Sequence, residues 1–299
     1  MIKMEYLLMA AAVLFSVSSN MILHKFRNRS FRTPGDVFLF NAGISCVWFA
    51  VLLSWSILSG DFSFSFGSLI FGVIYGVILC LFLYFKTQSM SSGPVALTSL
   101  IGNCAFIIAT WFGVVYANET VVPLQLAGMV IIVIALVMCI NPWKSSQKLT
   151  PSWFVWCGAF FLAGGLLGMF NKVFGKSEYS KEINFMMLAA SAVSAILFTL
   201  SGFLINKATH SPKPQIYKDS IIYIVTCGFV GCIYIRMNLW LAGVIPSVIF
   251  FPVSNGANVL LSTLSGQIFF GEKLNKMELA GIFVGLGAIL LIGCPQLFA

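Results

Sequence analysis

The chain has 299 residues, of which 59% are hydrophobic and only 9% charged, and its mean hydropathy is +0.97. Soluble globular proteins carry about 25% charged residues, so the composition excludes a soluble domain, a disordered chain and a disulfide-stapled secreted module. The net charge of +8 comes from 17 Lys and Arg against 9 Asp and Glu. No basic run is interleaved with polar, exposed aromatics, so we expect no nucleic-acid partner.

Ten apolar segments follow one another along the chain, separated by short polar or turn-forming breaks. Each is long enough to cross a bilayer, which takes about 20 mainly apolar residues. Strands are not expected, because an open sheet edge in lipid leaves backbone groups unsatisfied and barrel strands would alternate in polarity. The sequence predicts an all-α membrane protein with ten transmembrane helices. The predicted spans are 4–23, 36–58, 66–89, 95–116, 123–141, 152–172, 183–205, 219–241, 247–269 and 276–294.

The two halves of the chain repeat one another. A slide of 153 residues places Glu119 on Glu272, and a slide of 150 residues places Lys86 on Arg236. Offsets that drift by a few residues indicate a duplication with small loop insertions. Each copy holds five spans, an odd number, so the second copy enters the membrane upside down, as in many secondary transporters. The inverted five-helix repeats are predicted at 1–146 and 147–299.

Short motifs that recur in both halves carry a family resemblance. They are Ser18-Ser19-Asn20 followed by Lys25, Ser91-Ser92-Gly93, Asn118-Glu119 with Leu126-Ala127-Gly128, and Gly271-Glu272 with Leu279-Ala280-Gly281. With them the chain resembles the EamA-type ten-helix branch of the drug/metabolite transporter (DMT) superfamily over essentially its whole length. The resemblance implies alternating access around a central cavity lined by helices 1, 3, 4, 6, 8 and 9. It leaves the solute open among amino acids, amines, sugar phosphates, nucleotide sugars and drugs.

Two cations stand inside predicted spans, at equivalent places in the repeat. Lys86 lies in the third span and Arg236 in the eighth, where a charge at the bilayer centre costs roughly 2.5–3.5 kcal/mol. One interpretation is a pair of cations that bind a carboxylate or phosphate in a wet cavity. The other is snorkelling, because both residues lie one to two turns from the end of their helix.

Helix periodicity separates these cations from the polar side chains beside them. At 3.6 residues per turn, Tyr84 and Gln88 share one face of the third span, and Tyr234 and Asn238 share one face of the eighth. The cation in each span points to nearly the opposite side. If the tyrosine faces are wet, the substrate site is a polar-aromatic cage, and the cations snorkel or pair elsewhere.

Four asparagines inside spans form a second group of candidate substrate-binding residues: Asn20, Asn103, Asn255 and Asn258. An amide in an apolar medium needs partners. The last two follow Pro252, which removes a backbone donor and kinks the ninth span, and broken helices of this kind coordinate solutes in transporters. The alternative is that the amides join helices to one another.

Glu119 and Glu272 recur at the loops that close the fourth and ninth spans, where they have either a structural or a gating role. Such an acid is favourable just before the N-terminus of the following helix. None of the nine acids lies mid-span. Proton-driven export of cationic drugs usually relies on a buried carboxylate, so the sequence favours a neutral, zwitterionic or anionic solute.

Cysteine and glycine usage points to packing rather than to chemistry. The eight Cys lie in apolar segments without metal-ligand spacing, so we expect no metal and no cofactor. No span holds a cluster of His, Asp, Ser or Cys, so we do not expect an enzyme. Glycine pairs such as Gly72 with Gly76 let helices approach closely. This packing is expected within a monomer, with a weak homodimer as the alternative.

The distribution of Lys and Arg places the loops after odd-numbered spans in the cytoplasm, and an inner (cell) membrane location is expected. The favoured function is a secondary active or facilitative transporter of a small polar organic metabolite, with a carboxylated or phosphorylated solute as the narrower expectation. One alternative is an exporter of amines or drugs by proton antiport. An alternative of another class is a non-transporting scaffold or lipid-handling protein. For the favoured transporter we expect a small-molecule substrate and the lipid bilayer as partners.

Overall fold

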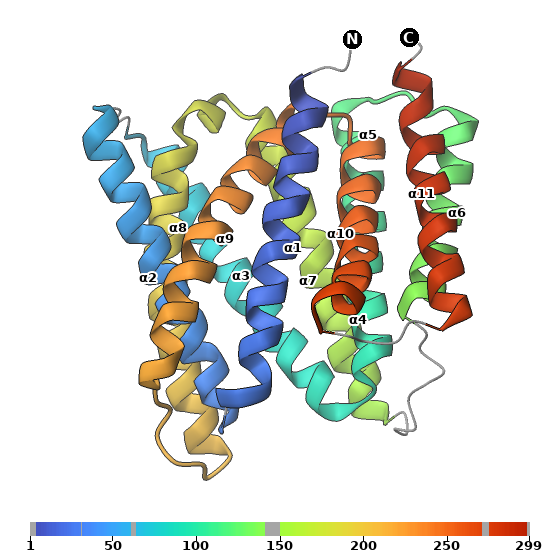
Figure 1. Ribbon diagram of the computed structural model, residues 1–299. Coiled ribbons are helices and arrows are strands. Elements are labelled where there is room, and N and C mark those ends of the chain that lie inside the picture. Colours follow the sequence, from blue (N-terminus) through green and yellow to red (C-terminus); the bar gives the residue numbers. More distant parts are fainter. Residues whose placement is uncertain (1–3, 31, 61–63, 141–149, 271–274, 298–299) are drawn as a thin grey trace. The chain divides into compact units, whose positions relative to one another are not determined.

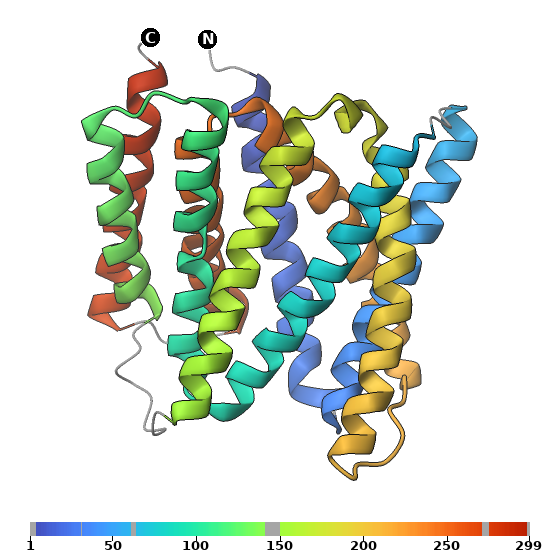
Figure 2. The same ribbon diagram turned by 180° about the vertical axis from the view of Figure 1, so that it is seen from behind.

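The computed structural model describes residues 4–30, 32–60, 64–140, 150–270 and 275–297, and within these ranges all regular structure is helical (Figures 1 and 2). Ten segments of the described chain are long and apolar enough to span a membrane. This confirms an all-α, multi-pass integral membrane protein. The helices are α1 (Met4–Ser30), α2 (Pro34–Ser59), α3 (Phe66–Ser92), α4 (Val95–Cys104), α5 (Phe106–Ala117), α6 (Pro123–Ile140), α7 (Pro151–Lys176), η2 (Glu178–Glu182), α8 (Ile183–Ala208), α9 (Lys218–Val244), α10 (Ser247–Phe270) and α11 (Lys276–Leu297).

The fourth predicted span differs from the expectation of one continuous helix. It is divided into α4 and α5 at Ala105, whose N–H donates to the Gly102 carbonyl in a tighter, three-residue bond. Such a turn between helical segments often marks a functional position. The equivalent span of the second half, α10, is continuous but contains Pro252.

The chain forms two compact units, each of which takes helices from both sequence halves. Unit 1 consists of Met1–Leu14, Leu81–Lys176 and Leu241–Ala299, and unit 2 consists of Phe15–Cys80 and Ser177–Trp240. The predicted repeats, 1–146 and 147–299, are a division of the sequence. The compact units are a division of the packing, and the two divisions cut the chain at different places.

In unit 2, α2 and α8 pack along their length. The start of α2 meets the end of α8, where Gly35 N–H donates to Asn206 Oδ1 at 2.8 Å. Further along, the hydroxyl of Ser194 donates to that of Ser45 at 3.0 Å. The two helices therefore run antiparallel, which the ribbon also shows (Figure 1). They are the second helices of the two predicted repeats.

In unit 1, α6 and α11 form the corresponding pair and lie side by side in both views (Figures 1 and 2). Gly128 near the start of α6 packs against Ile292 near the end of α11. At the other end of the pair, Gly281 packs against Cys139. This pair is also antiparallel and joins the fifth helices of the two repeats. Repeat-related helices that pair in opposite directions are what inverted repeats produce.

Glycines make several of these close approaches possible. A Cβ added at Gly165 or Gly168 of α7 would collide with Ile108 or Ala109 of α5, both within unit 1. The same holds within unit 2 for Gly72 of α3, which packs against the backbone of α8 at Met186. The predicted role of the glycines in close helix packing is confirmed at these positions.

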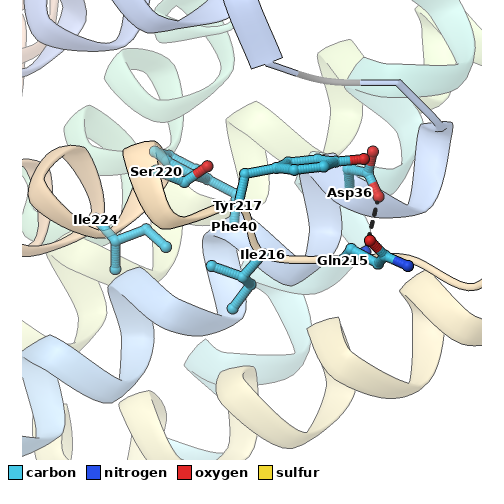
Figure 3. A pocket seen from close by; sticks show the side chains of 7 residues that line it. All are labelled: Asp36, Phe40, Gln215, Ile216, Tyr217, Ser220 and Ile224. Carbon is cyan, nitrogen blue, oxygen red and sulfur yellow. Dashed lines mark hydrogen bonds between the residues drawn. The ribbon is translucent and has the colours of Figure 1, made fainter.

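One buried acid in unit 2 organises a connecting segment rather than a site. Asp36 accepts hydrogen bonds from the N–H groups of Thr33, at the start of α2, and of Gln215, which precedes α9 (Figure 3). The guanidinium of Arg32 lies over the ring of Tyr217, 5.0 Å from its centroid. Because the Asp36 carboxylate bonds these two backbone N–H groups, it fixes the segment before α9 against the first turn of α2.

Candidate functional site

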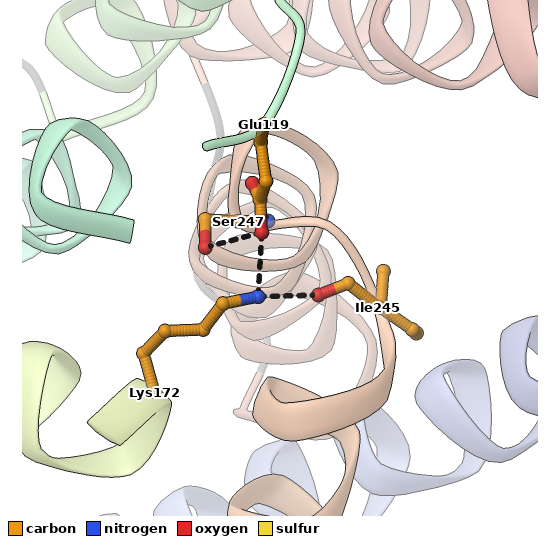
Figure 4. Close-up of polar contacts among 4 residues, drawn as sticks. All are labelled: Glu119, Lys172, Ile245 and Ser247. Carbon is orange, nitrogen blue, oxygen red and sulfur yellow. Dashed lines mark hydrogen bonds and ion pairs between the residues drawn. The ribbon is translucent and has the colours of Figure 1, made fainter. Parts of the chain in front are cut away.

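A buried ion pair stands at one end of unit 1. Lys172 Nζ lies 2.6 Å from Glu119 Oε1, and the Lys172 side chain is only 1% exposed (Figure 4). The same ammonium donates to the Ile245 carbonyl at 3.2 Å. The pair joins the segment after α5 to α7 and to the turn before α10.

Local backbone geometry brings Glu119 to this position. Helix α5 ends at Asn118, which adopts a left-handed conformation with φ of 50°. Asparagine tolerates this conformation better than most residues. The Glu119 N–H then bonds back to the Val114 carbonyl at 3.0 Å, so the chain turns sharply. This turn directs the carboxylate toward α10 rather than along α5.

Glu119 also neutralises the start of a helix that is distant in sequence. Its Oε2 accepts from the Ser247 N–H at 2.6 Å, and its Oε1 accepts from the Ser247 hydroxyl at 3.2 Å. Ser247 is the first residue of α10, where unpaired N–H groups and the helix dipole favour a negative charge. The carboxylate therefore bonds the start of α10, a helix distant in sequence, which the sequence analysis did not predict.

Lys172 is a site residue that the sequence analysis did not select. The predicted sixth span ended at residue 172, which placed this lysine among the helix ends. The observed α7 continues to Lys176, so the lysine lies one turn inside the helix and is buried. A signal was present in the sequence: Lys25 and Lys172 are related by the repeat, as are Glu119 and Glu272. Glu272 lies outside the described residues.

Two asparagines, one beside the break between α4 and α5 and one beside Pro252 in the continuous helix α10, make the same hydrogen bond. In α4, Asn103 Nδ2 donates to the Ser99 carbonyl at 2.7 Å, two residues before the break. In α10, Asn255 Nδ2 donates to the Phe251 carbonyl at 2.9 Å, three residues after Pro252. Donor and acceptor are both shifted by 152 residues between the halves, close to the shifts of 150 and 153 residues from which the repeat is predicted. Both bonds use the side-chain Nδ2 as donor, so the Oδ1 atoms of Asn103 and Asn255 are not part of them.

The other two asparagines occupy different parts of the fold. Asn258 lies one turn beyond Asn255 in α10, and its Oδ1 accepts from the Ser262 hydroxyl at 3.3 Å. It belongs to unit 1, as do Asn103 and Asn255. Asn20 lies in the part of α1 that belongs to unit 2, where it is exposed.

Helix α9 presents two different polar faces, as its periodicity predicted. Tyr234 and Asn238 lie together, with Asn238 Nδ2 donating to the tyrosine hydroxyl at 3.4 Å, and Tyr234 shares a side-chain hydrogen bond with Ser16 of α1. Arg236 points elsewhere: its Nε donates to Asn184 Oδ1 of α8 at 2.9 Å. All of these residues belong to unit 2. The tyrosine face and the cation therefore do not share one pocket within this unit.

The equivalent residues of the first half lie in unit 1. The ring of Tyr84 packs edge-on against Trp156 of α7, with the centroids 5.9 Å apart. Lys86 and Gln88 are partly buried in the same helix, α3, and the Gln88 carbonyl accepts from the hydroxyl of Ser92 at 2.8 Å. Tyr84 thus packs against the aromatic ring of Trp156, whereas Tyr234 bonds the side chains of Asn238 and Ser16.

The cysteines and acids of the described chain form no candidate metal centre. The seven cysteines that the structure describes are free thiols, at positions 46, 80, 104, 139, 157, 227 and 232. The roles of the predicted substrate-binding residues stay predictions, since their geometry alone does not test a solute.

Fold and site together define a class: an all-α, multi-pass integral membrane protein. No family model matches the chain. No curated protein matches it either. A solved structure described only as "Crystal structure of protein" is similar to it, with a TM-score of 0.78 and 14% sequence identity over 97% of each chain. At that identity the likeness shows the fold alone.

Proposed function

We propose that this chain is a secondary transporter of the EamA type within the DMT superfamily, which moves a small polar organic solute by alternating access. The observation that carries the proposal is the pair of matched amides, Asn103 beside the break between α4 and α5 and Asn255 beside Pro252 of α10. Helix interruptions next to amides supply oriented polar groups at membrane depth, the usual construction of a solute site in inverted-repeat carriers.

Helix interruption also explains why these amides suit a ligand. In an unbroken apolar helix a side-chain amide that bonds its own i−4 carbonyl is largely satisfied. Pro252 has no N–H to donate to the carbonyl four residues earlier, and the Ala105 N–H bonds the Gly102 carbonyl in place of the one before it. A donor on a ligand can use carbonyl groups released in this way. The amide oxygens of Asn103 and Asn255 add acceptors beside them. A solute with hydroxyl or ammonium donors matches this set.

The expected charge of the solute depends on the role of Lys86. A carboxylated or phosphorylated solute is supported by this cation, whereas the second cation, Arg236, bonds Asn184 of α8 and lies apart from Tyr234. Uptake that survives Lys86→Gln at full rate, with unchanged preference between acids and their amides, would exclude the anionic solute.

An amine or drug exporter coupled to protons is the alternative function. An imposed pH gradient that drives uptake of a cationic amine would support it.

The experiment begins with a thermal-shift screen of the purified protein against a metabolite library. A ligand present at about 100 times its dissociation constant stabilises by about 2.7 kcal/mol. Compounds that stabilise the protein are then tested for uptake and exchange in proteoliposomes. The expected result is saturable uptake that falls about tenfold in Asn103→Ala and in Asn255→Ala, the size expected for one lost hydrogen bond to a polar solute.

Asn41 offers a matched control. It lies in α2 and makes the same bond, from Nδ2 to the Val37 carbonyl at 2.8 Å, in a helix without a break or an internal proline. Asn41→Ala should leave uptake unchanged. Equal losses in all three variants would show that the amides only support their helices. Absence of any transported compound, with the protein folded, would favour the non-transporting scaffold.

We also propose that the chain is not an enzyme and that it resides in the cell (inner) membrane as a monomer or weak homodimer. The first statement rests on the sequence, in which no span holds a cluster of His, Asp, Ser or Cys. Fluorescence microscopy of a tagged chain and size-exclusion chromatography with light scattering test the location and the assembly.

A further inference from the structure

A groove within unit 2 runs between α2 and α9. Its volume is about 200 Å³, and its lining residues are Val51, Leu52, Trp55, Cys232, Ile233, Arg236 and Met237. The floor is apolar and buried, with Leu52 and Cys232 only 2% and 3% exposed. Trp55 and Arg236 stand at the mouth, where both side chains are exposed. A cation at the opening of an apolar groove is an amphipathic arrangement.

The guanidinium of Arg236 is held in place by α8. Its Nε donates to Asn184 Oδ1 at 2.9 Å, which uses one of the five N–H groups of the side chain. The two terminal amino groups are not part of that bond. Arginine with a fixed Nε presents them as a planar fork, the geometry that binds phosphate or carboxylate oxygens in pairs.

Helix register places this cation at a membrane boundary. Asn184 is the second residue of α8, and Trp55 lies one turn before α2 ends at Ser59. Because α2 and α8 run antiparallel, the end of one lies level with the start of the other (Figure 1). Trp side chains favour the level of the lipid headgroups. The mouth of the groove is therefore at headgroup depth and its floor, at Val51 and Leu52, is deeper.

We propose that this groove is a binding site for an anionic phospholipid, with its phosphate on Arg236 and an acyl chain along Val51, Leu52 and Ile233. Three observations select this occupant: the positive charge at the mouth, the apolar floor beneath it, and the depth of each. A zwitterionic lipid would bring its own cation to Arg236, which weakens its contact. The site is separate from the proposed solute site, because it uses the α9 face opposite Tyr234.

The test measures lipid retention by native mass spectrometry. Delipidated protein is mixed with equal amounts of phosphatidylglycerol and phosphatidylcholine in detergent, and the bound lipids are counted at increasing concentration. The wild type should retain one phosphatidylglycerol preferentially. Arg236→Gln should weaken that binding about tenfold, the loss expected for charge-assisted hydrogen bonds. Arg236→Lys should recover part of it, since charge is kept but the fork is lost.

Arg32 supplies the matched control. It is an exposed arginine of the same unit, stacked over Tyr217 beside the start of α2. Arg32→Gln should leave retention of phosphatidylglycerol unchanged. If it lowers retention as much as Arg236→Gln does, the lipid responds to general surface charge, and the proposal is overturned. Unchanged retention in Arg236→Gln overturns it as well.

A second variant tests the groove while keeping the charge. Val51→Phe should fill the space beside Leu52 and reduce phosphatidylglycerol retention with Arg236 intact, while a thermal unfolding curve checks that the variant is folded. Full retention of phosphatidylglycerol in this variant would show that the lipid binds elsewhere and would overturn the proposal.

Competition with inorganic phosphate is a further test. Inorganic phosphate in millimolar excess should not displace the lipid. Displacement by phosphate would identify a soluble anion as the occupant instead. None of these outcomes depends on transport, so they are distinct from a failure of the proposed function.

Discussion

The two compact units share one construction and differ in how polar groups are buried. Each is built on an antiparallel pair of repeat-related helices, α6 with α11 in unit 1 and α2 with α8 in unit 2. The contacts that join α2 and α8 include neutral hydrogen bonds, such as Ser194 with Ser45. Unit 1 contains the divided span α4–α5, the proline-containing α10 and the ion pair of Lys172 with Glu119.

This difference shows where a membrane protein accepts a buried charge. In unit 1 the end of α5 and the start of α10 meet, and helix ends carry backbone groups without intrahelical partners. A carboxylate there satisfies the N–H of Ser247, and the ammonium of Lys172 balances it. In unit 2 the middles of α2 and α8, where the backbone is already bonded, are joined by hydroxyl side chains. The buried acid of this unit, Asp36, also lies at a helix start, where it accepts from backbone N–H groups.

The largest expected effect comes from breaking the ion pair of unit 1. Lys172→Met leaves Glu119 buried without its counter-charge, and losing one partner of a buried pair typically costs about 3–5 kcal/mol. We expect a loss of that size in the free energy of unfolding, measured by denaturant titration in mixed micelles. The double variant Lys172→Met with Glu119→Gln should recover most of the loss, because no charge then remains. A loss below about 1 kcal/mol in the single variant would show that the pair is not buried in solution.

The second effect tests the close packing of unit 2. A Cβ added at Gly35 would lie 2.5 Å from both Asn206 Oδ1 and the Gly202 carbonyl. Gly35→Ala should therefore destabilise by about 1–3 kcal/mol, the usual cost of overpacking. Gly158→Ala is the control, because nothing lies within 4 Å of a Cβ at that exposed position of α7. It should be neutral or mildly stabilising, since alanine favours a helix. Similar behaviour of the two variants would contradict the α2–α8 packing.

A smaller effect is expected from a single neutral contact in the same helix pair. Ser194→Ala removes the hydroxyl that donates to Ser45, and we expect a loss of about 1 kcal/mol. Ser54→Ala removes a hydroxyl that bonds its own helix at Ala50 on the exposed side of α2, and it should change stability by less than about 0.5 kcal/mol. Both values come from the same unfolding titration. A loss in Ser194→Ala as large as that in Lys172→Met would remove the contrast between the units.

The smallest structural effect is expected for the tyrosine face of α9. Tyr234→Phe keeps the ring and removes a hydroxyl that shares one hydrogen bond with Ser16 and a long one, at 3.4 Å, with Asn238, so stability should fall by no more than about 1 kcal/mol. Solute binding is the more sensitive measurement. If this face binds solute, the dissociation constant of a transported compound should rise severalfold in Tyr234→Phe. An unchanged constant would remove Tyr234 from the solute site.

Most of the helices could be predicted from the sequence because a bilayer imposes a length and an apolar composition on every span. The interruption at Ala105 could not, since no proline or charge marks it and only the backbone geometry shows the break. The faces of α9 could be predicted, because helix periodicity fixes the angle between Arg236 and Tyr234. Their partners, Asn184 and Ser16, lie on other helices, and periodicity contains no information about them.

The sequence by itself determined the ten spans and the scarcity of charge, because both follow from local composition, and it predicts the internal repeat by self-comparison. The tertiary structure decided how those charges are used. The sequence alone indicates a lysine at a helix end, whereas in the structure Lys172 is a buried cation, because Glu119 and the Ile245 carbonyl reach it from distant parts of the chain. The sequence alone indicates that Arg236 is a charge inside a span, and packing places it at the mouth of a groove. Pair contacts between distant segments set the free energy of a charge in a membrane, and these exist only once the helices have packed.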